Sequence, residues 1–129
     1  MALVIDDRVK ENSTTSGTGN ITLSGVPSGQ GNVTFNSAIG TGNTTYYCIF
    51  EQGTNTFEIG LGTLSGSTTL ERTTVINNSS GSTSKISFTG GTLDVFCTMP
   101  AAKTVYLDAS GTPVGAASAG FALAMAVGL

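Results

Sequence analysis

The sequence predicts an all-β fold, an antiparallel β-sandwich or small barrel of about eight strands with an apolar C-terminal tail. Apolar residues alternate with polar ones along most of the chain, and helical spacing is nearly absent before the C-terminus. Clusters of Gly, Ser, Asn and Thr interrupt the alternating runs about every 10 residues, a spacing typical of small sandwiches and barrels. A length of 129 residues suits a single domain with a tail.

Each strand is predicted from an apolar run that lies between two turn clusters. In "NITLSG", Ile21 and Leu23 share a face, and in "NVTF", Val33 and Phe35 do the same. On this basis the predicted strands span residues 3–9, 19–24, 32–36, 44–51, 56–62, 69–76, 85–89 and 93–99, with a candidate ninth at 103–107.

Three of these runs carry more specific information. "TYYCIF" and "LDVFCTM" are apolar on both faces, which predicts that they form central strands. In "TFEIGLG", Glu58, Gly60 and Gly62 lie on one face of the strand, and the apolar side chains lie on the other. Two glycines on one face predict that another backbone or a large side chain packs against them.

The two cysteines and the N-terminus indicate a reducing compartment. Cys48 and Cys97 each lie inside an apolar run, so free buried thiols are favoured over the alternative of a disulfide. The start "MALVIDDRVK" has no basic region before its apolar run, which ends at Ile5, so no signal peptide is predicted. We therefore expect synthesis in the cytoplasm.

Charge is scarce. Charged residues make up 10% of the chain, against about 25% in an ordinary soluble domain. The net charge is −3 and the basic residues are scattered, so binding to nucleic acid is not expected. A neutral, hydroxyl-rich surface fits a protein that packs against copies of itself or other chains. A secreted domain kept soluble by its hydroxyls is the alternative.

After Asp108 the sequence changes character, since residues 109–129 carry no charge. We therefore expect a domain at 1–108 and an apolar tail at 109–129. The tail is too interrupted by Gly, Ser and Pro113 to span a membrane. It is expected to dock on a neighbouring subunit or, as the alternative, on its own sheet. Its candidate interaction residues are Phe121, Leu123, Met125 and Val127.

The residues offer little to an enzyme. The chain has no histidine, and two separate cysteines cannot form a zinc cluster, so no catalytic residue, metal or cofactor is expected. Glu51 and Glu58 flank a turn and could face each other across a hairpin, although chance explains this spacing better. Tyr46, Tyr47 and Tyr106 could stack on a sugar, but packing of the paired tyrosines in a core strand is the favoured interpretation.

Five of the 13 charged residues fall within positions 6–11. If residues 3–9 are extended, Asp6 and Arg8 share one face and Asp7 lies on the other. Two interpretations stay open, a solvated edge strand whose charges deter edge-to-edge pairing and a docking contact. The candidate interaction residues of the segment are Asp6, Arg8, Lys10 and Glu11.

The chain resembles a pattern found in virion proteins of tailed bacteriophages. The resemblance is carried, in this order, by "DDRVKENSTTSGTGNITLSG", "GNTTYYCIF", "FEIGLGTLS", "TLERTTVINNSSG" and "DVFCTMPAAKTVYLD", and it covers about residues 6–108. Many such proteins continue into a fibre or precede one, whereas this sequence stops at Leu129.

The resemblance implies a non-enzymatic β-rich module of the virion surface, with the major capsid protein or other virion proteins as partners. It favours a capsid decoration, or cement, protein, found on the virion after synthesis in the host cytoplasm and assembled as a homo-oligomer, by analogy a trimer. The alternatives are an adaptor or base module of a head or tail fibre, and a carbohydrate-binding β-sandwich that would recognise a host-surface glycan.

Overall fold

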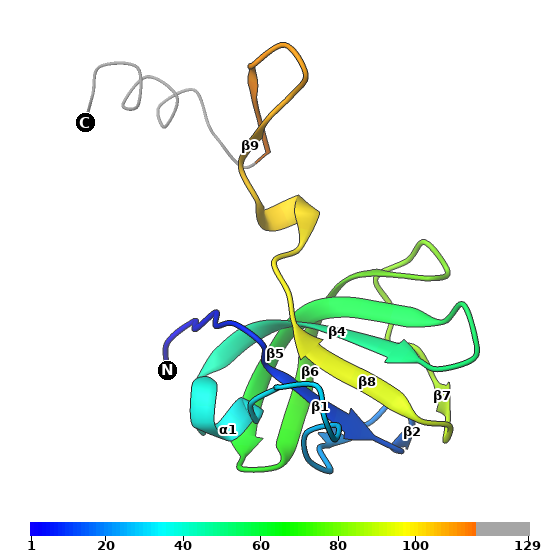
Figure 1. The fold of residues 1–129 in the computed structure, drawn as a ribbon. Coiled ribbons are helices and arrows are strands. Elements are labelled where there is room, and N and C mark those ends of the chain that lie inside the picture. Colours follow the sequence, from blue (N-terminus) through cyan, green and yellow to red (C-terminus); the bar gives the residue numbers. More distant parts are fainter. Residues whose placement is uncertain (116–129) are drawn as a thin grey trace. The chain divides into compact units, whose positions relative to one another are not determined.

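The computed structural model describes residues 1–115 and divides the chain into two compact units, Met1–Thr98 and Met99–Leu129 (Figure 1). The division falls after Thr98, ahead of the expected boundary at 108. The fold is all-β, as the alternation predicts, and each unit is described by itself below. The candidate tail residues Phe121, Leu123, Met125 and Val127 lie outside the described residues.

The first unit is built on a six-stranded antiparallel sheet. Its order is β1 (Lys10–Ser13), β8 (Leu93–Cys97), β4 (Thr44–Glu51), β5 (Phe57–Gly66), β6 (Thr69–Asn78) and β3 (Ile21–Thr22). The Asn12 N–H donates to the Gly25 carbonyl at 2.9 Å, and the Ser24 N–H donates to the Asn12 carbonyl at 2.8 Å. These two bonds join β1 to the residues that follow β3, so the sheet curls into a nearly closed barrel.

The central strands are where the sequence places them. β4 spans the predicted residues 44–51 and is paired on both sides, with β5 and β8. β8 is likewise paired on both sides, with β1 and β4. The next strands, β5 and β6, end later than predicted, at Gly66 and Asn78. The residues "TLSG" belong to β5, and its ladder with β6 continues to the pair Gly66 and Thr69.

The predicted strand at 32–36 is wrong. Val33 makes a single parallel bridge to Val9, and the chain then forms the short helix α1 (Phe35–Ala38). The Thr34 hydroxyl accepts the Ser37 N–H at 3.2 Å, which caps the helix. Gly40 ends it with a φ of +88°, a conformation that glycine adopts without steric cost. The alternation of Val33 and Phe35 is compatible with a strand and also with a capped turn of helix, so it did not distinguish the two.

The predicted strand at 3–9 is also wrong. Leu3 makes one parallel bridge to Thr44, and the chain turns at Asp7 and Arg8 before β1 begins. Arg8 has a φ of 60°, so Asp6 and Arg8 do not share the face of a strand. The turn directs the Val9 side chain into the barrel core, immediately before β1 begins.

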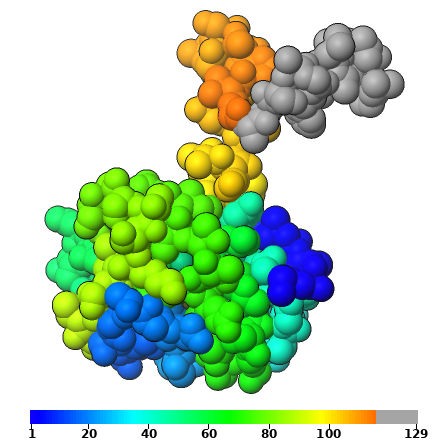
Figure 2. All heavy atoms as spheres, turned by 180° about the vertical axis from the view of Figure 1, so that it is seen from behind, coloured from blue at the N-terminus to red at the C-terminus, as the bar shows by residue number. Residues whose placement is uncertain are grey.

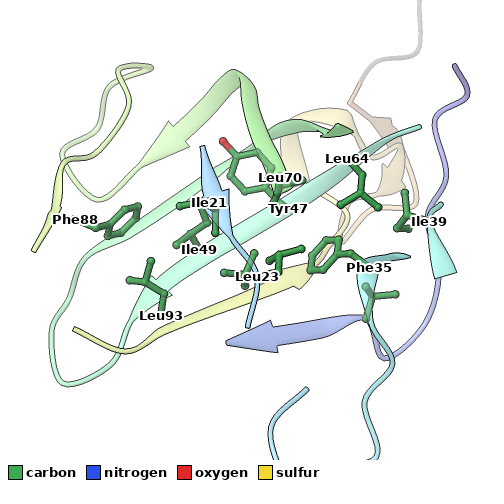
Figure 3. Close-up of a cluster of buried hydrophobic side chains, with 12 residues drawn as sticks. Ile21, Leu23, Phe35, Ile39, Tyr47, Ile49, Leu64, Leu70, Phe88 and Leu93 are labelled. Carbon is green, nitrogen blue, oxygen red and sulfur yellow. The ribbon is translucent and has the colours of Figure 1, made fainter. Parts of the chain in front are cut away.

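The barrel core is a single cluster of apolar side chains that surrounds Tyr47 (Figure 3). A Cβ atom on Gly60 would lie 2.6 Å from the Tyr47 hydroxyl, and one on Gly62 would lie 2.9 Å from its ring. The expectation that a large side chain packs on these glycines is confirmed. The buried members of the cluster are Val9, Ile21, Leu23, Phe35, Ile39, Tyr47, Ile49, Leu64, Leu70, Phe88, Leu93 and Val95.

A small two-stranded sheet, β2 (Ser16–Gly17) with β7 (Phe88–Thr89), completes the first unit. The second unit contains a 3₁₀ turn at Ala101–Lys103 and a hairpin of β9 (Tyr106–Leu107) and β10 (Pro113–Val114). The candidate ninth strand at 103–107 is therefore a turn followed by the first strand of a hairpin.

Candidate interaction site

The charged N-terminal segment forms a fixed turn at the surface of the barrel. Arg8 adopts the left-handed backbone region at φ 60°, which costs a residue with a Cβ atom about 1–2 kcal/mol. The N–H of Val33 and the side-chain amide of Asn32 both donate to the Arg8 carbonyl, at 2.9 and 3.1 Å. The Arg8 guanidinium donates to the Gln30 carbonyl. These contacts hold the turn in a conformation that the backbone alone disfavours.

Lys10 lies beside Arg8 and points to the same loop. Its ammonium group donates to the Gln30 side-chain oxygen at 3.2 Å and lies 3.8 Å from the Asp94 carboxylate. The same Asp94 oxygen also accepts from Asn12 and Gln52. Both cations are therefore positioned by neutral or shared partners, and their positive charge is not cancelled by a dedicated acid.

A shallow groove of about 320 Å³ lies along this turn. Its lining combines the two cations with apolar and polar side chains, namely Arg8, Val9, Lys10, Asn32, Phe96 and Cys97. The Asn32 side-chain oxygen is buried and has no hydrogen-bond partner among the described residues. The groove thus offers two positive groups and an aromatic ring to a bound chain.

Of the other two candidates in the segment, one is internal and one lies on the surface. Glu11 is buried, and its carboxylate accepts the Phe35 N–H at 2.9 Å, so it fixes the start of α1. Asp6 is exposed and accepts the Asp7 N–H at 2.7 Å. Of the four candidates in this segment, Arg8 and Lys10 line the groove.

The first five residues add an apolar row to this surface. Met1, Leu3 and Ile5 are exposed by 92%, 51% and 45%, whereas Val4 packs against the core. The Val4 N–H donates to the Thr44 carbonyl at 2.9 Å, which holds the row in place along the barrel. Figure 2 shows these N-terminal residues, in dark blue, on the outside of the barrel.

Inside the barrel the structure contains a polar cluster that the sequence analysis missed. Arg72 on β6 and Glu58 on β5 form a buried ion pair, with the Arg72 Nε 2.8 Å from a Glu58 carboxylate oxygen. The Tyr47 hydroxyl on β4 donates to the same oxygen at 2.7 Å. The placement of Glu58 on the face of Gly60 and Gly62 was the available signal, because glycines on that face make room for large inward side chains.

Arg72 also joins distant parts of the chain. Its guanidinium donates to the carbonyls of Gly17, at 3.2 Å, of Gly19, at 3.4 Å, and of Ile86, and it lies 5.2 Å from the ring centre of Phe88. The loops around β2 and β7 are therefore tied to the barrel wall by one side chain. This is an internal structural role.

The ionisation of the cluster follows from its contacts. Burial would raise the pKa of Glu58, but hydrogen bonds from Arg72, Tyr47 and the Ile86 N–H outweigh it and lower that pKa. Burial, followed by the bond to Glu58, raises the pKa of Tyr47 beyond its ordinary value of 10.0. The pair is thus ionised and the tyrosine neutral near neutral pH.

The remaining candidates resolve as follows. Tyr47 is fully buried, so core packing is confirmed for it, and Tyr46 is half-buried. Cys48 pairs with Phe96 and Cys97 with Tyr47 on adjacent strands, so the two thiols point to opposite faces, and both are free. Burial raises the pKa of the Cys48 thiol to about 11.

The two carboxylates that flank a turn have separate partners. Glu51 accepts from the backbone and hydroxyl of Thr89, whereas Glu58 belongs to the buried cluster. Within residues 1–115 no three metal-ligating side chains come together. No helix in this part of the chain is long and apolar enough to cross a membrane.

Comparison with known proteins gives no relative. No family model, no curated protein and no solved structure matches the chain.

Proposed function

We propose that this chain is a non-enzymatic structural protein of a bacteriophage virion, a decoration protein that binds the outer surface of the capsid. The ordered resemblance over residues 6–108 supports the class of protein. The observation that carries the mode of action is the N-terminal surface, where an exposed apolar row is followed by a groove with two fixed cations.

The residues of the "DRVKE" segment divide their roles in a way that supports docking. Val9 and Glu11 build the barrel, one in the core and the other at the start of α1. The side chains of Arg8 and Lys10 instead lie at the surface, where both donate to Gln30, and Arg8 is kept at an unfavourable φ. Strained residues persist where the surrounding structure holds them, and they gather at binding and catalytic sites. We expect the two cations to meet a carboxylate of a capsid protein.

Attachment at a symmetric surface also suits a weak site of this kind. A capsid repeats each binding position many times, and multivalent attachment multiplies modest contacts. The apolar row contributes about 25 cal/mol for each Å² that it buries, before the cost of ordering. Because exposed ion pairs contribute only about 0–1 kcal/mol each, the cations would supply orientation more than affinity.

The substitution Arg8→Gly tests this proposal. Glycine adopts a φ of 60° freely, so the barrel should be as stable as the wild type or more stable, by about 1 kcal/mol. Loss of the guanidinium should weaken binding to capsids that lack the protein by up to about fivefold, measured by co-sedimentation with purified particles. Lys85→Ala removes an exposed cation elsewhere on the barrel and should bind like the wild type.

The number of copies per particle separates the proposal from the fibre alternative. A decoration protein occupies the repeated sites of the shell, so quantitative gel analysis should show its copies in constant proportion to the major capsid protein. About a dozen copies or fewer would indicate the base of a head or tail fibre instead. Unchanged binding by Arg8→Gly and by Lys10→Ala would remove the N-terminal turn from the docking surface.

A further inference from the structure

The second unit has an unusual distribution of apolar residues. From Ala101 to Gly115 no residue is buried. The largest exposed side chains are Tyr106, at 50%, and Leu107, at 66%, and Val105 is exposed as well. Single exposed apolar residues are ordinary, but here three follow one another, with Val105 directly before β9 and Tyr106 and Leu107 within it.

Both faces of the hairpin carry this apolar surface. Tyr106 lies opposite Val114, and Leu107 lies opposite Pro113. Because successive residues of a strand point to opposite faces, one pair covers each face. A two-stranded hairpin on its own is at best marginally stable in water, and it gains stability when further strands or an apolar face pack against it.

The hairpin is nevertheless well defined at its turn. The Asp108 carboxylate accepts the N–H groups of Ser110 and Thr112, at 2.9 and 2.8 Å, and Gly111 takes a φ of +80°. The Asp108 N–H donates to the Thr112 carbonyl at 2.9 Å. The negative charge of Asp108 is thus engaged within the turn.

Charge is divided unequally between the two units. The first unit contains four of the five basic and seven of the eight acidic residues, and so carries the whole net charge of −3. The second unit has one residue of each sign, Lys103 and Asp108, and its net charge is zero. Barrels of two copies repel each other, whereas two hairpins meet without repulsion.

We propose that residues 99–115 form a self-association surface whose occupant is the same segment of a second copy of this chain. Within residues 1–115, each strand of the two-stranded sheet pairs on one side alone, so a second hairpin can add to it by backbone hydrogen bonds. An identical hairpin matches it in length and in its apolar faces. A foreign partner recognised by charge would find only Lys103 available in this segment.

This inference concerns association of the chain with itself, and it is tested without capsids, so it can fail while the capsid proposal stands. The full-length protein should sediment as an oligomer, with its mass rising between about 1 and 100 μM. Leu107→Asp places like charges in the contact and should raise the concentration needed for assembly at least tenfold. Asn55→Asp adds the same charge to an exposed turn of the barrel and should assemble like the wild type.

Hydrogen exchange distinguishes a second copy of the chain from other segments that could pack on the hairpin. Protection of the Tyr106, Leu107 and Val114 amides should increase with protein concentration if another copy covers the hairpin. Protection that does not depend on concentration would assign the cover to residues 116–129 of the same chain. Three results would overturn the proposal: protection that does not depend on concentration, a monomer at every concentration, or assembly of Leu107→Asp at wild-type concentrations.

Discussion

In the barrel, Arg72 is 2% exposed, and its guanidinium donates to a carboxylate and to three backbone carbonyls. In the second unit, by contrast, Leu107 lies on the hairpin of β9 and β10 and is 66% exposed. A charged side chain is inside one unit and an apolar one is outside the other. The barrel packs charged and apolar side chains together in one interior. From Ala101 to Gly115 no residue is buried, which is why we propose that the hairpin is a surface for a second copy of the chain.

The largest expected effect comes from removal of the buried cation. Arg72→Ala leaves the Glu58 carboxylate without its partner and the carbonyls of Gly17, Gly19 and Ile86 without a donor. Loss of one member of a buried pair costs about 3–5 kcal/mol, so the free energy of unfolding in urea should fall by that amount.

Leu107→Asp is the matched change in the other unit. It puts a charge on an exposed site, and the free energy of unfolding at low protein concentration should change by less than about 0.5 kcal/mol. A loss below about 1 kcal/mol for Arg72→Ala would mean that its ion pair behaves like one at the surface, and the contrast between the units would disappear.

A smaller effect is expected where Tyr47 packs against glycine. In Gly60→Ala the new Cβ atom would meet the Tyr47 hydroxyl and the Thr74 carbonyl, both at 2.6 Å. Overpacking of this kind costs about 1–3 kcal/mol, and thermal or urea unfolding measures it.

Gly19→Ala is the control, since a Cβ atom there has no heavy atom within 4 Å. Its stability should equal that of the wild type or exceed it slightly, because alanine restricts the unfolded chain. Equal losses at both glycines would indicate a backbone effect and not a contact with Tyr47.

The pH dependence of the wild-type barrel is the smallest effect near neutral pH, and it grows in acid as Glu58 is protonated. Its pKa is lowered in the folded barrel, so its contribution to stability is present above the ordinary value of 4.5 and is lost as the pH falls through the folded pKa. Urea unfolding should therefore show a decline below about pH 4.5. In alkali, the raised pKa of Tyr47 predicts a second decline above pH 10.0.

Glu58→Gln isolates the acid effect. The variant should be less stable than the wild type at pH 7, because Arg72 loses its counter-ion. The difference between the two proteins should narrow as the pH falls and Glu58 is protonated. If the two free energies of unfolding differed by the same amount from pH 7 to pH 3, Glu58 would not be the residue that causes the loss of stability in acid.

The sequence was informative where a pattern had a single structural meaning. The run at 44–51 is apolar on both faces, and it forms a strand that is paired on both sides. The glycines at 60 and 62 predicted a close approach, and Tyr47 makes it. The alternation near Val33 had two meanings, and the hydroxyl of Thr34 together with Gly40 decided for a helix.

The candidate site was only half predicted. Clustering of charge drew attention to Arg8, Lys10 and Glu11, but it could not separate the surface cations from the buried acid. That separation depends on the turn at Arg8, which is held by hydrogen bonds from Asn32 and Val33, more than twenty positions away along the chain. Local pattern carries no information about such partners.

The sequence by itself determined the all-β class, the central strands, the free thiols and the absence of charge after Asp108, because each depends on residue type or on period-two spacing. Only the tertiary structure decided that Glu58 and Arg72 face each other inside a nearly closed barrel and that Tyr106–Leu107 pairs with Pro113–Val114 in a hairpin. Those features depend on which strands become neighbours, and backbone hydrogen bonds between distant segments set that order.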